Sequence, residues 1–122
     1  MSEIRLSLKE MCAKFDVTPR TLRYYEYIEL LSPEKDGRNR RYSAREVARM
    51  TLIMRGRRFG FSLEEIRQWL EIYEKEGTQS QLRAWLDMAD RQLAALRAQA
   101  AALENTIDDL EKLRAQAADL LP

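Results

Sequence analysis

The feature that most constrains this chain is a run without glycine or proline over residues 78–121. Within it, apolar residues alternate strictly by four and three positions: Leu82, Leu86, Ala89, Leu93, Leu96, Ala100, Leu103, Ile107 and Leu110. This spacing is the heptad pattern of a coiled coil. A helix of this length spans roughly 60 Å and has no partner of similar length in its own chain. The run therefore predicts a dimerisation helix over 78–121 that pairs with a second copy of the chain.

Residues 6–75 carry the signals of several shorter helices. Ser-x-x-Glu capping boxes or a Thr-Pro pair mark four helix starts, at Ser7–Glu10, Thr18-Pro19, Ser43–Glu46 and Ser62–Glu65. Gly60 and Gly77 stand where the third and fourth helices are expected to end. The first two helices are separated only by residues 16–18, which is the spacing of a helix-turn-helix.

The segment between the second and third helices indicates a wing. Pro33 and Asp36-Gly37 are turn formers, and we expect a short two-stranded hairpin that carries Arg38, Arg40 and Arg41. The predicted fold class is mostly α. A winged helix-turn-helix DNA-binding domain over 6–75 is followed by the coiled-coil helix over 78–121.

Charge is distributed unevenly, although the net charge is only +1. Residues 1–75 hold 16 basic and 12 acidic side chains, whereas residues 76–122 hold 5 basic and 8 acidic ones. Within 35–58 there are nine basic residues and two acidic ones. A local basic block of this kind favours a polyanionic partner for the first part of the chain.

The second helix offers a face suited to DNA. Arg20, Arg23, Tyr24 and Tyr27 recur at helical spacing, and arginine can read guanine or bind phosphate when a helix enters the major groove. The alternative is an ordinary solvated face. The hairpin arginines have the same alternative, and the cations at the end of the third helix also suit its dipole.

Composition argues against other kinds of site. The chain has one cysteine and no histidine, so we expect no metal, no cofactor and no catalytic nucleophile beside a base, and therefore no enzyme. No apolar run is long enough to predict a membrane span, and the expected location is cytoplasmic, associated with the nucleoid. Trp69, Tyr73 and Trp85 are most simply packing residues, with a ligand pocket between them as the alternative.

Four blocks of sequence together resemble one family. They are Val17–Glu26 (VTPRTLRYYE), Leu30–Pro33 (LLSP), Arg40–Ser43 (RRYS) and Arg57–Ile66 (RRFGFSLEEI), and their order and spacing are similar to those of the MerR family of bacterial transcriptional regulators. The resemblance implies a homodimer joined by an antiparallel coiled coil. It also implies binding to a pseudo-palindromic promoter operator in double-stranded DNA, whose bending and untwisting control RNA polymerase indirectly.

The resemblance also places contacts on DNA. Arg20, Arg23 and Tyr24 match recognition-helix positions, Arg40 and Tyr42 match the wing, and Arg57 matches a second wing, with Tyr25 supporting or touching phosphate. The predicted DNA-binding set is Thr18, Arg20, Thr21, Arg23, Tyr24, Tyr25, Arg38, Arg40, Arg41, Tyr42, Arg57 and Arg58.

The chain also departs from parts of the family pattern. Thr78, Gln79 and Ser80 stand near a place where metal-sensing members carry a cysteine. The overall pattern looks like short members without a separate effector domain, some of which are linked to branched-chain amino acid or fatty acid catabolism. Any small-molecule effector stays open. A coiled-coil adaptor that binds protein through the head is the alternative function, and it would show fewer arginines and more exposed apolar residues.

Overall fold

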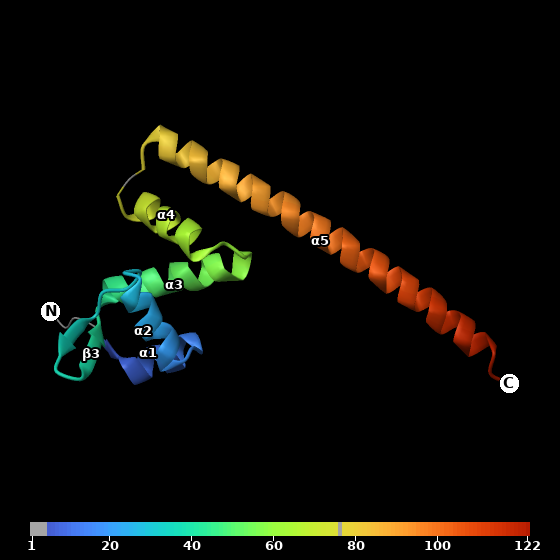
Figure 1. Cartoon of the computed structure of the whole chain (residues 1–122), viewed down its shortest axis with the longest axis horizontal. Helices are drawn as coiled ribbons and strands as arrows, with labels where there is room; N and C mark the ends of the chain where they lie inside the picture. The colour runs from blue at the N-terminus through green and yellow to red at the C-terminus, as the bar shows by residue number, and fades with distance from the viewer. Residues whose placement is uncertain (1–4, 76) are drawn as a thin grey trace. The chain divides into compact units, whose positions relative to one another are not determined.

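A computed structural model describes residues 5–75 and 77–122. The chain divides into two compact units, Met1–Thr78 and Gln79–Pro122, which we call the head and the long helix (Figure 1). The head contains α1 (Leu8–Phe15), α2 (Pro19–Tyr27), α3 (Ala44–Phe59) and α4 (Leu63–Glu74), with strands β1 (Leu6–Ser7), β2 (Glu34–Asp36) and β3 (Asn39–Tyr42). The mostly α, winged helix-turn-helix class is confirmed.

The predicted helix starts are correct, and two of the three capping boxes form. Ser7 and Ser62 each accept from the N3 backbone N–H while the N3 glutamate returns to the cap backbone. The third prediction is wrong in its second half. Ser43 caps α3, but the Glu46 side chain does not return to it and instead accepts from Ser32 N at 2.9 Å.

The predicted two-stranded hairpin forms as β2 and β3, and β1 extends it to a three-stranded sheet that was not predicted. Its order is β1-β3-β2, with Leu6 opposite Tyr42 and Lys35 opposite Arg40. β1 was missed because a two-residue strand directly before a capped helix has no periodicity of its own. Its pairing ties the start of α1 to the wing, so the wing is anchored on both sides of β3.

Apolar side chains from every helix of the head form one core. Tyr25 and Leu22 come from the inner side of α2, and the loop after α2 adds Leu30 and Leu31. The buried apolar residues of the head are Met11, Leu22, Tyr25, Leu30, Leu31, Tyr42, Met50, Ile53, Phe61, Ile66, Trp69 and Leu70. Burial of this area is the main favourable term in folding, and it fixes which side of α2 faces outward.

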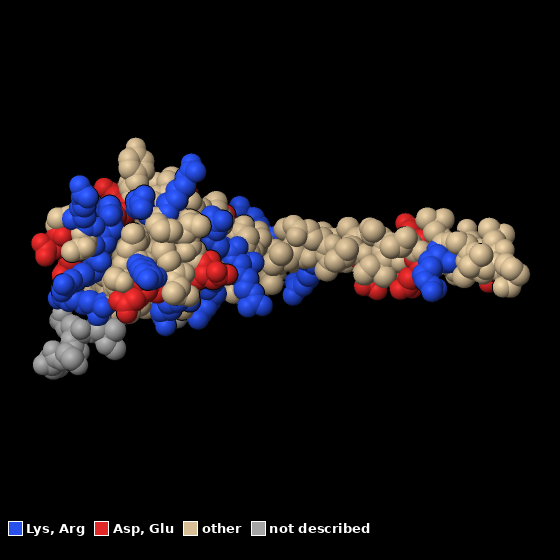
Figure 2. Space-filling view, turned by 90° about the horizontal axis from the view of Figure 1, so that it is seen from below, with Lys and Arg blue, Asp and Glu red and all other residues tan. Residues whose placement is uncertain are grey.

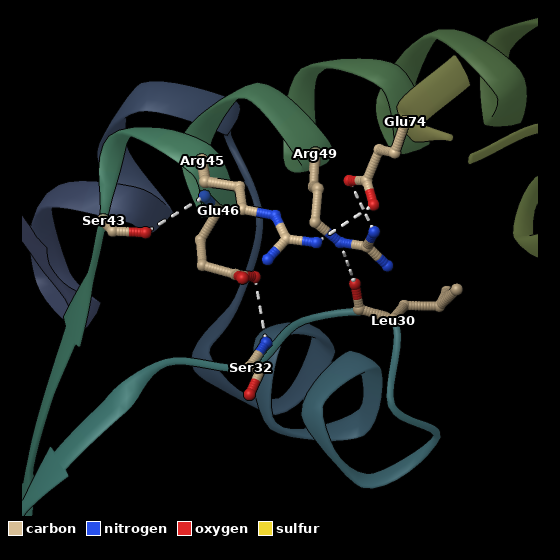
Figure 3. Close-up of polar contacts among 7 residues, drawn as sticks. All are labelled: Leu30, Ser32, Ser43, Arg45, Glu46, Arg49 and Glu74. Carbon is tan, nitrogen blue, oxygen red and sulfur yellow. Dashed lines mark hydrogen bonds and ion pairs between the residues drawn. The ribbon is translucent and has the colours of Figure 1, made fainter. Parts of the chain in front are cut away.

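Polar side chains of α3 hold the loop that follows α2 (Figure 3). The Arg49 Nε donates to the Leu30 carbonyl at 2.9 Å, and its Nη1 donates to Glu74 at 2.6 Å. Arg45 also donates to Glu74, at 3.2 Å. The bond to Leu30 satisfies a backbone carbonyl and holds the loop after α2 against α3, whereas the two bonds to Glu74 join α3 to α4.

The contact between α3 and α4 depends on close approach at Gly56. A Cβ added there would lie 2.8 Å from Ile66 Cγ1. The turn that follows uses Gly60 in the left-handed region, at φ 88°, as the predicted end of α3. The other predicted stop is displaced: α4 ends at Glu74, with Lys75 as its cap residue, and not beside Gly77.

The long helix is α5 (Gln79–Asp119). The leucines and the isoleucine of its predicted seam are 38–66% exposed, and Met88 is the buried residue of α5. Across the described residues, no helix is both long and apolar enough to span a membrane.

Candidate nucleic-acid interface

The outward side of α2 presents the residues that the sequence predicted. Arg20 and Arg23 are exposed, Tyr24 is 50% exposed and Tyr27 is 83% exposed. Leu22 and Tyr25 take the opposite side into the core. The helix is therefore fixed by one side and leaves a continuous polar and aromatic side free for a ligand.

The start of α2 is built by its two threonines. The Thr18 Oγ1 accepts from Thr21 N at 3.2 Å and lies 3.1 Å from the Thr21 Oγ1, while Pro19 occupies the first turn. Thr18 thus caps the helix, and Thr21 provides the backbone N–H and the hydroxyl that the cap contacts. Thr18 is exposed and Thr21 is half-buried, so the cap stands beside Arg20 at the accessible end of the helix.

Two predicted contact residues lie inside the head. Tyr42 is fully buried, so its predicted direct contact with DNA is corrected: its ring belongs to the core behind the wing. Its hydroxyl has no hydrogen-bond partner among the described residues, and burial, followed by the charge of Glu26, raises its pKa to about 12. Tyr25 is 3% exposed, which leaves the supporting role predicted for it rather than a phosphate contact.

The wing presents its arginines on two different sides. Arg38 and Arg41 are exposed. Arg40 is half-buried, and its Nε donates to Glu26 Oε2 at 2.7 Å. Lys35 pairs with the other oxygen of Glu26. Of the predicted wing arginines, Arg38 and Arg41 are therefore exposed, whereas Arg40 is paired with a carboxylate of the head.

Sequence reasoning missed the carboxylate at the centre of this arrangement. The side chain of Glu26 is 13% exposed. Burial raises the pKa of this carboxyl, but hydrogen bonds and charges from Lys35 and Arg40 outweigh burial and leave the pKa below 4.5. Lys35 and Arg40 lie on the wing, 9 and 14 residues after Glu26 in the sequence, so no local pattern pointed to their pairing with Glu26.

A hollow beside the wing is lined by further lysine and arginine side chains. It is lined by the start of α1 and by β3 and the turn before it: Arg5, Ser7, Leu8, Lys9, Glu10, Arg38, Asn39, Arg40 and Arg41. Arg5, directly before β1, pairs with Glu34 on β2, the strand on the other side of β3. Arg5 and Lys9 were not predicted, because a single cation before or within a capped helix looks like ordinary surface.

The last turn of α3 carries the remaining predicted pair. Arg57 and Arg58 are both exposed, directly before the turn at Gly60. Their place also suits the helix dipole, as the sequence allowed. Figure 2 shows many basic side chains, with acidic ones among them, on the visible side of the head, whereas the outer part of the long helix carries few basic ones.

Two other kinds of site were considered, a ligand pocket and a metal site, and the ligand pocket stays a prediction. Trp69 is buried in the head, the side chain of Tyr73 lies outside the described residues, and Trp85 belongs to the other unit. In the described part of the chain, no three histidine, cysteine or carboxylate side chains cluster as a metal site would require. Cys12 is half-buried.

Comparisons with known proteins identify the class. The family description "MerR HTH family regulatory protein" matches residues 6–72, and "MerR, DNA binding" matches residues 47–120. The chain belongs to the MerR family and is a DNA-binding transcriptional regulator.

Curated relatives agree with this assignment. The regulator HmrR of Rhizobium leguminosarum is 39% identical over 70 residues, which cover 57% of this chain and 54% of that protein. CueR of Yersinia pestis is 28% identical over 111 residues, covering 89% of this chain and 73% of CueR. An uncharacterised HTH-type regulator of Pseudomonas aeruginosa is 30% identical over 110 residues, covering 86% and 82% of the two chains.

Solved structures share the fold. A MerR-family regulator from Bacillus cereus has a TM-score of 0.75 at 22% identity, covering 98% of this chain and 87% of its own. HiNmlR, a family member lacking the sensor domain and bound to promoter DNA, has a TM-score of 0.67 at 22% identity, with 98% of each chain covered. PbrR691 from Ralstonia metallidurans, in complex with lead(II), has a TM-score of 0.62 at 29% identity, covering 86% and 84%.

Proposed function

We propose that the chain acts as a homodimer on a pseudo-palindromic promoter operator in double-stranded DNA. One α2 enters the major groove of each half-site, and the wing and the end of α3 bind the flanking phosphates. The observation that carries this proposal is the outward side of α2, where Arg20, Arg23 and two exposed tyrosines form a surface that the core does not use.

The long helix supports the dimer. Its seam of exposed leucines repeats at heptad spacing over Leu82–Leu110, and an apolar stripe of that length is stable in water only when another helix covers it. An antiparallel pairing of two such helices would set the distance between two heads. Operator spacing would then be determined by the coiled coil rather than by the reading surface.

Distortion of the operator is the proposed regulatory step. Phosphate contacts on either side of α2 would anchor each head on the backbone, and a dimer whose spacing differs from that of relaxed DNA must deform the duplex between half-sites. RNA polymerase would then meet a promoter of altered twist, so its response follows without a direct protein contact. HiNmlR, which shares the fold, was crystallised on promoter DNA.

The reading surface is tested by binding to DNA fragments selected from genomic DNA by the purified full-length protein. Arg23→Ala should reduce the preference for the selected operator over random duplex by roughly 1–3 kcal/mol, if the guanidinium reads a base. Arg91→Ala, which removes an exposed cation from the outer side of α5, is the matched control and should retain the preference. Equal loss in both variants, or in neither, would contradict the proposed surface.

The same selection identifies the controlled promoter. The sequence pattern favours an operon of branched-chain amino acid or fatty acid catabolism, and the enriched fragments would lie upstream of such genes. Enrichment spread evenly over coding DNA would contradict operator-specific function. A small-molecule effector is a separate matter, tested by thermal shift of the protein against acyl-CoA compounds.

A further inference from the structure

We infer that Glu26 is a positioning residue that orients the wing against the recognition helix, and that Arg40 and Lys35 serve this carboxylate rather than DNA phosphates. The inference deepens the proposed function and rests on it, because it assumes that α2 and the exposed wing arginines meet the same duplex. It differs from the sequence prediction, which placed Arg40 on DNA.

The strand register explains why a carboxylate is needed at this place. Lys35 and Arg40 are direct cross-strand partners on β2 and β3. Two like charges directly opposite one another destabilise a strand pair. The Glu26 carboxylate receives one cation on each oxygen, Arg40 on Oε2 and Lys35 on Oε1, so it removes this repulsion and joins both strands to α2.

The position of Glu26 on its helix makes the link directional. On α2 it falls between the buried Leu22 and the exposed Arg23, at the edge of the outward side. The wing is therefore attached to the flank of the helix that carries Arg23. A shift of this attachment would move wing and helix relative to each other, and phosphate contacts and base contacts could then no longer be made together.

Strand alternation separates Arg40 from its neighbour. Arg40 and the buried Tyr42 share the inner side of β3, whereas Arg41 is exposed on the other side. The side chains of Glu26 and Arg40 are mostly shielded, at 13% and 24% exposure, whereas the side chain of Lys35 is 57% exposed. Arg41 has no ion-pair partner among the described residues. Adjacent arginines on one strand thus provide a matched pair, one held by the head and one available to an anion.

The test measures the salt dependence of duplex binding, which counts the phosphates that a protein neutralises. Full-length variants are titrated with a fluorescent random duplex and with the selected operator at several NaCl concentrations. Arg41→Gln should lower the logarithmic salt slope by about 0.9 for each bound head, or about 1.8 for the dimer, whereas Arg40→Gln should leave it unchanged. Arg40→Gln should still reduce operator preference at least about fivefold, because the wing is no longer held in place.

Glu26→Gln should have the opposite effect on salt dependence. If one or both wing cations of each head become available to phosphate, the slope on random duplex should rise by about 0.9 to 1.8 per bound head, while operator preference falls. Glu29→Gln makes the same charge change three residues later, at an exposed position, and should alter neither quantity. Adding Arg40→Gln to Glu26→Gln should return the slope toward the wild-type value.

The outcomes separate the two proposals. If Arg41→Gln lowers the slope but Glu26→Gln behaves like Glu29→Gln, the role of Glu26 is wrong and the DNA surface stands. If Arg40→Gln lowers the slope as much as Arg41→Gln, Arg40 binds phosphate and the inference is also overturned. If neither Arg38→Gln nor Arg41→Gln lowers the slope, the proposed wing surface itself is wrong. Circular dichroism melts confirm that each variant is folded.

Discussion

The head and the long helix differ in how far their apolar side chains are buried. Among its described residues, the head buries twelve large apolar side chains, begins two helices with capping boxes and bonds Arg49 to a backbone carbonyl of the loop after α2. Among the described residues of α5, by contrast, only Met88 is buried, while the seam leucines stay open to water. The head therefore has an internal core, whereas the long helix carries an apolar seam that is exposed in the single chain.

This contrast explains where each part of the function would reside. Because the core positions α2 from behind, reading of DNA is a property of one head. Because the exposed seam would be covered by a second copy in the proposed dimer, the spacing between two heads would be a property of that dimer. The effect of a substitution in the head on stability and DNA binding should therefore be the same at any protein concentration. The effect of a substitution in the seam should depend on protein concentration.

The largest effect is expected from charges placed in the seam. The double variant Leu96→Lys/Leu103→Lys should prevent dimerisation, because four lysines would be buried in an apolar interface. Operator affinity should fall about 100-fold or more, since two linked heads bind far more tightly than one. Light scattering reports mass and anisotropy reports affinity. Ala98→Lys/Asn105→Lys, on the opposite side of the same helix turns, should remain dimeric, and a monomeric control would contradict the assigned seam.

Truncation of a core side chain in the head should also have a large effect. It should lower the free energy of unfolding by an amount that does not depend on protein concentration. Leu22→Ala removes a fully buried side chain behind the reading surface and should lower the free energy of unfolding by about 2–5 kcal/mol. Urea melts at two protein concentrations measure this.

Leu103→Ala in the seam should instead show a loss of stability that becomes smaller as protein concentration rises. If both variants behave identically, the proposed difference between a self-contained head and a long helix stabilised by dimerisation is wrong.

An added methyl group at Gly56 should open the contact between α3 and α4. The new Cβ would stand 2.8 Å from Ile66 Cγ1, in a buried contact that cannot simply move aside. Gly56→Ala should destabilise the head by about 1–3 kcal/mol, despite the higher helix propensity of alanine. Thermal melts give the value. A stabilised variant would mean that the helices separate freely there.

Acid should weaken the head through its paired carboxylates. For Glu26 and Glu74, burial raises the pKa but hydrogen bonds and charges from neighbouring cations outweigh it, so each folded pKa lies below 4.5. Stability from these pairs is present above the unfolded pKa and is lost as pH falls through the folded pKa. Melts between about pH 7 and pH 3 should show Glu26→Gln/Glu74→Gln less stable than wild type at neutral pH and approaching it in acid. Parallel curves would contradict the pairs.

The smallest effect is expected at Tyr42. Its buried hydroxyl lacks a partner among the described residues, so Tyr42→Phe should be neutral or stabilising by up to about 1 kcal/mol. DNA affinity should not change, because the ring lies inside the head. A clear loss of operator binding would restore the direct contact that the sequence predicted.

Local signals in the sequence were sufficient for the helices of the head. Ser7, Thr18, Ser43 and Ser62 cap helices that begin where predicted, because a cap is a contact between near neighbours in the chain. The exposed side of α2 was equally readable, since helical spacing places Arg20, Arg23 and Tyr24 together whatever surrounds them. The DNA-binding class was predicted from the four sequence blocks that resemble the MerR family and from their spacing.

Side chains whose partners are distant could not be assigned in this way. Glu46 has the sequence of a capping residue but bonds to Ser32, and Arg40 has the sequence of a wing contact but bonds to Glu26. Tyr42 looked like a surface residue of a hairpin until β1 and the core enclosed it. In each case the competing partner lies on another element, and nothing in the local pattern shows which partner is nearer.

The sequence by itself therefore determined the elements, the outward side of α2 and the apolar seam of α5, because each depends on periodicity and short-range hydrogen bonding. Only the tertiary structure decided which polar side chains remain available to DNA. Packing brings Glu26 between Lys35 and Arg40 and places Arg49 between Leu30 and Glu74. A charge that is matched inside the head cannot be counted on its surface, and only the folded chain sets those distances.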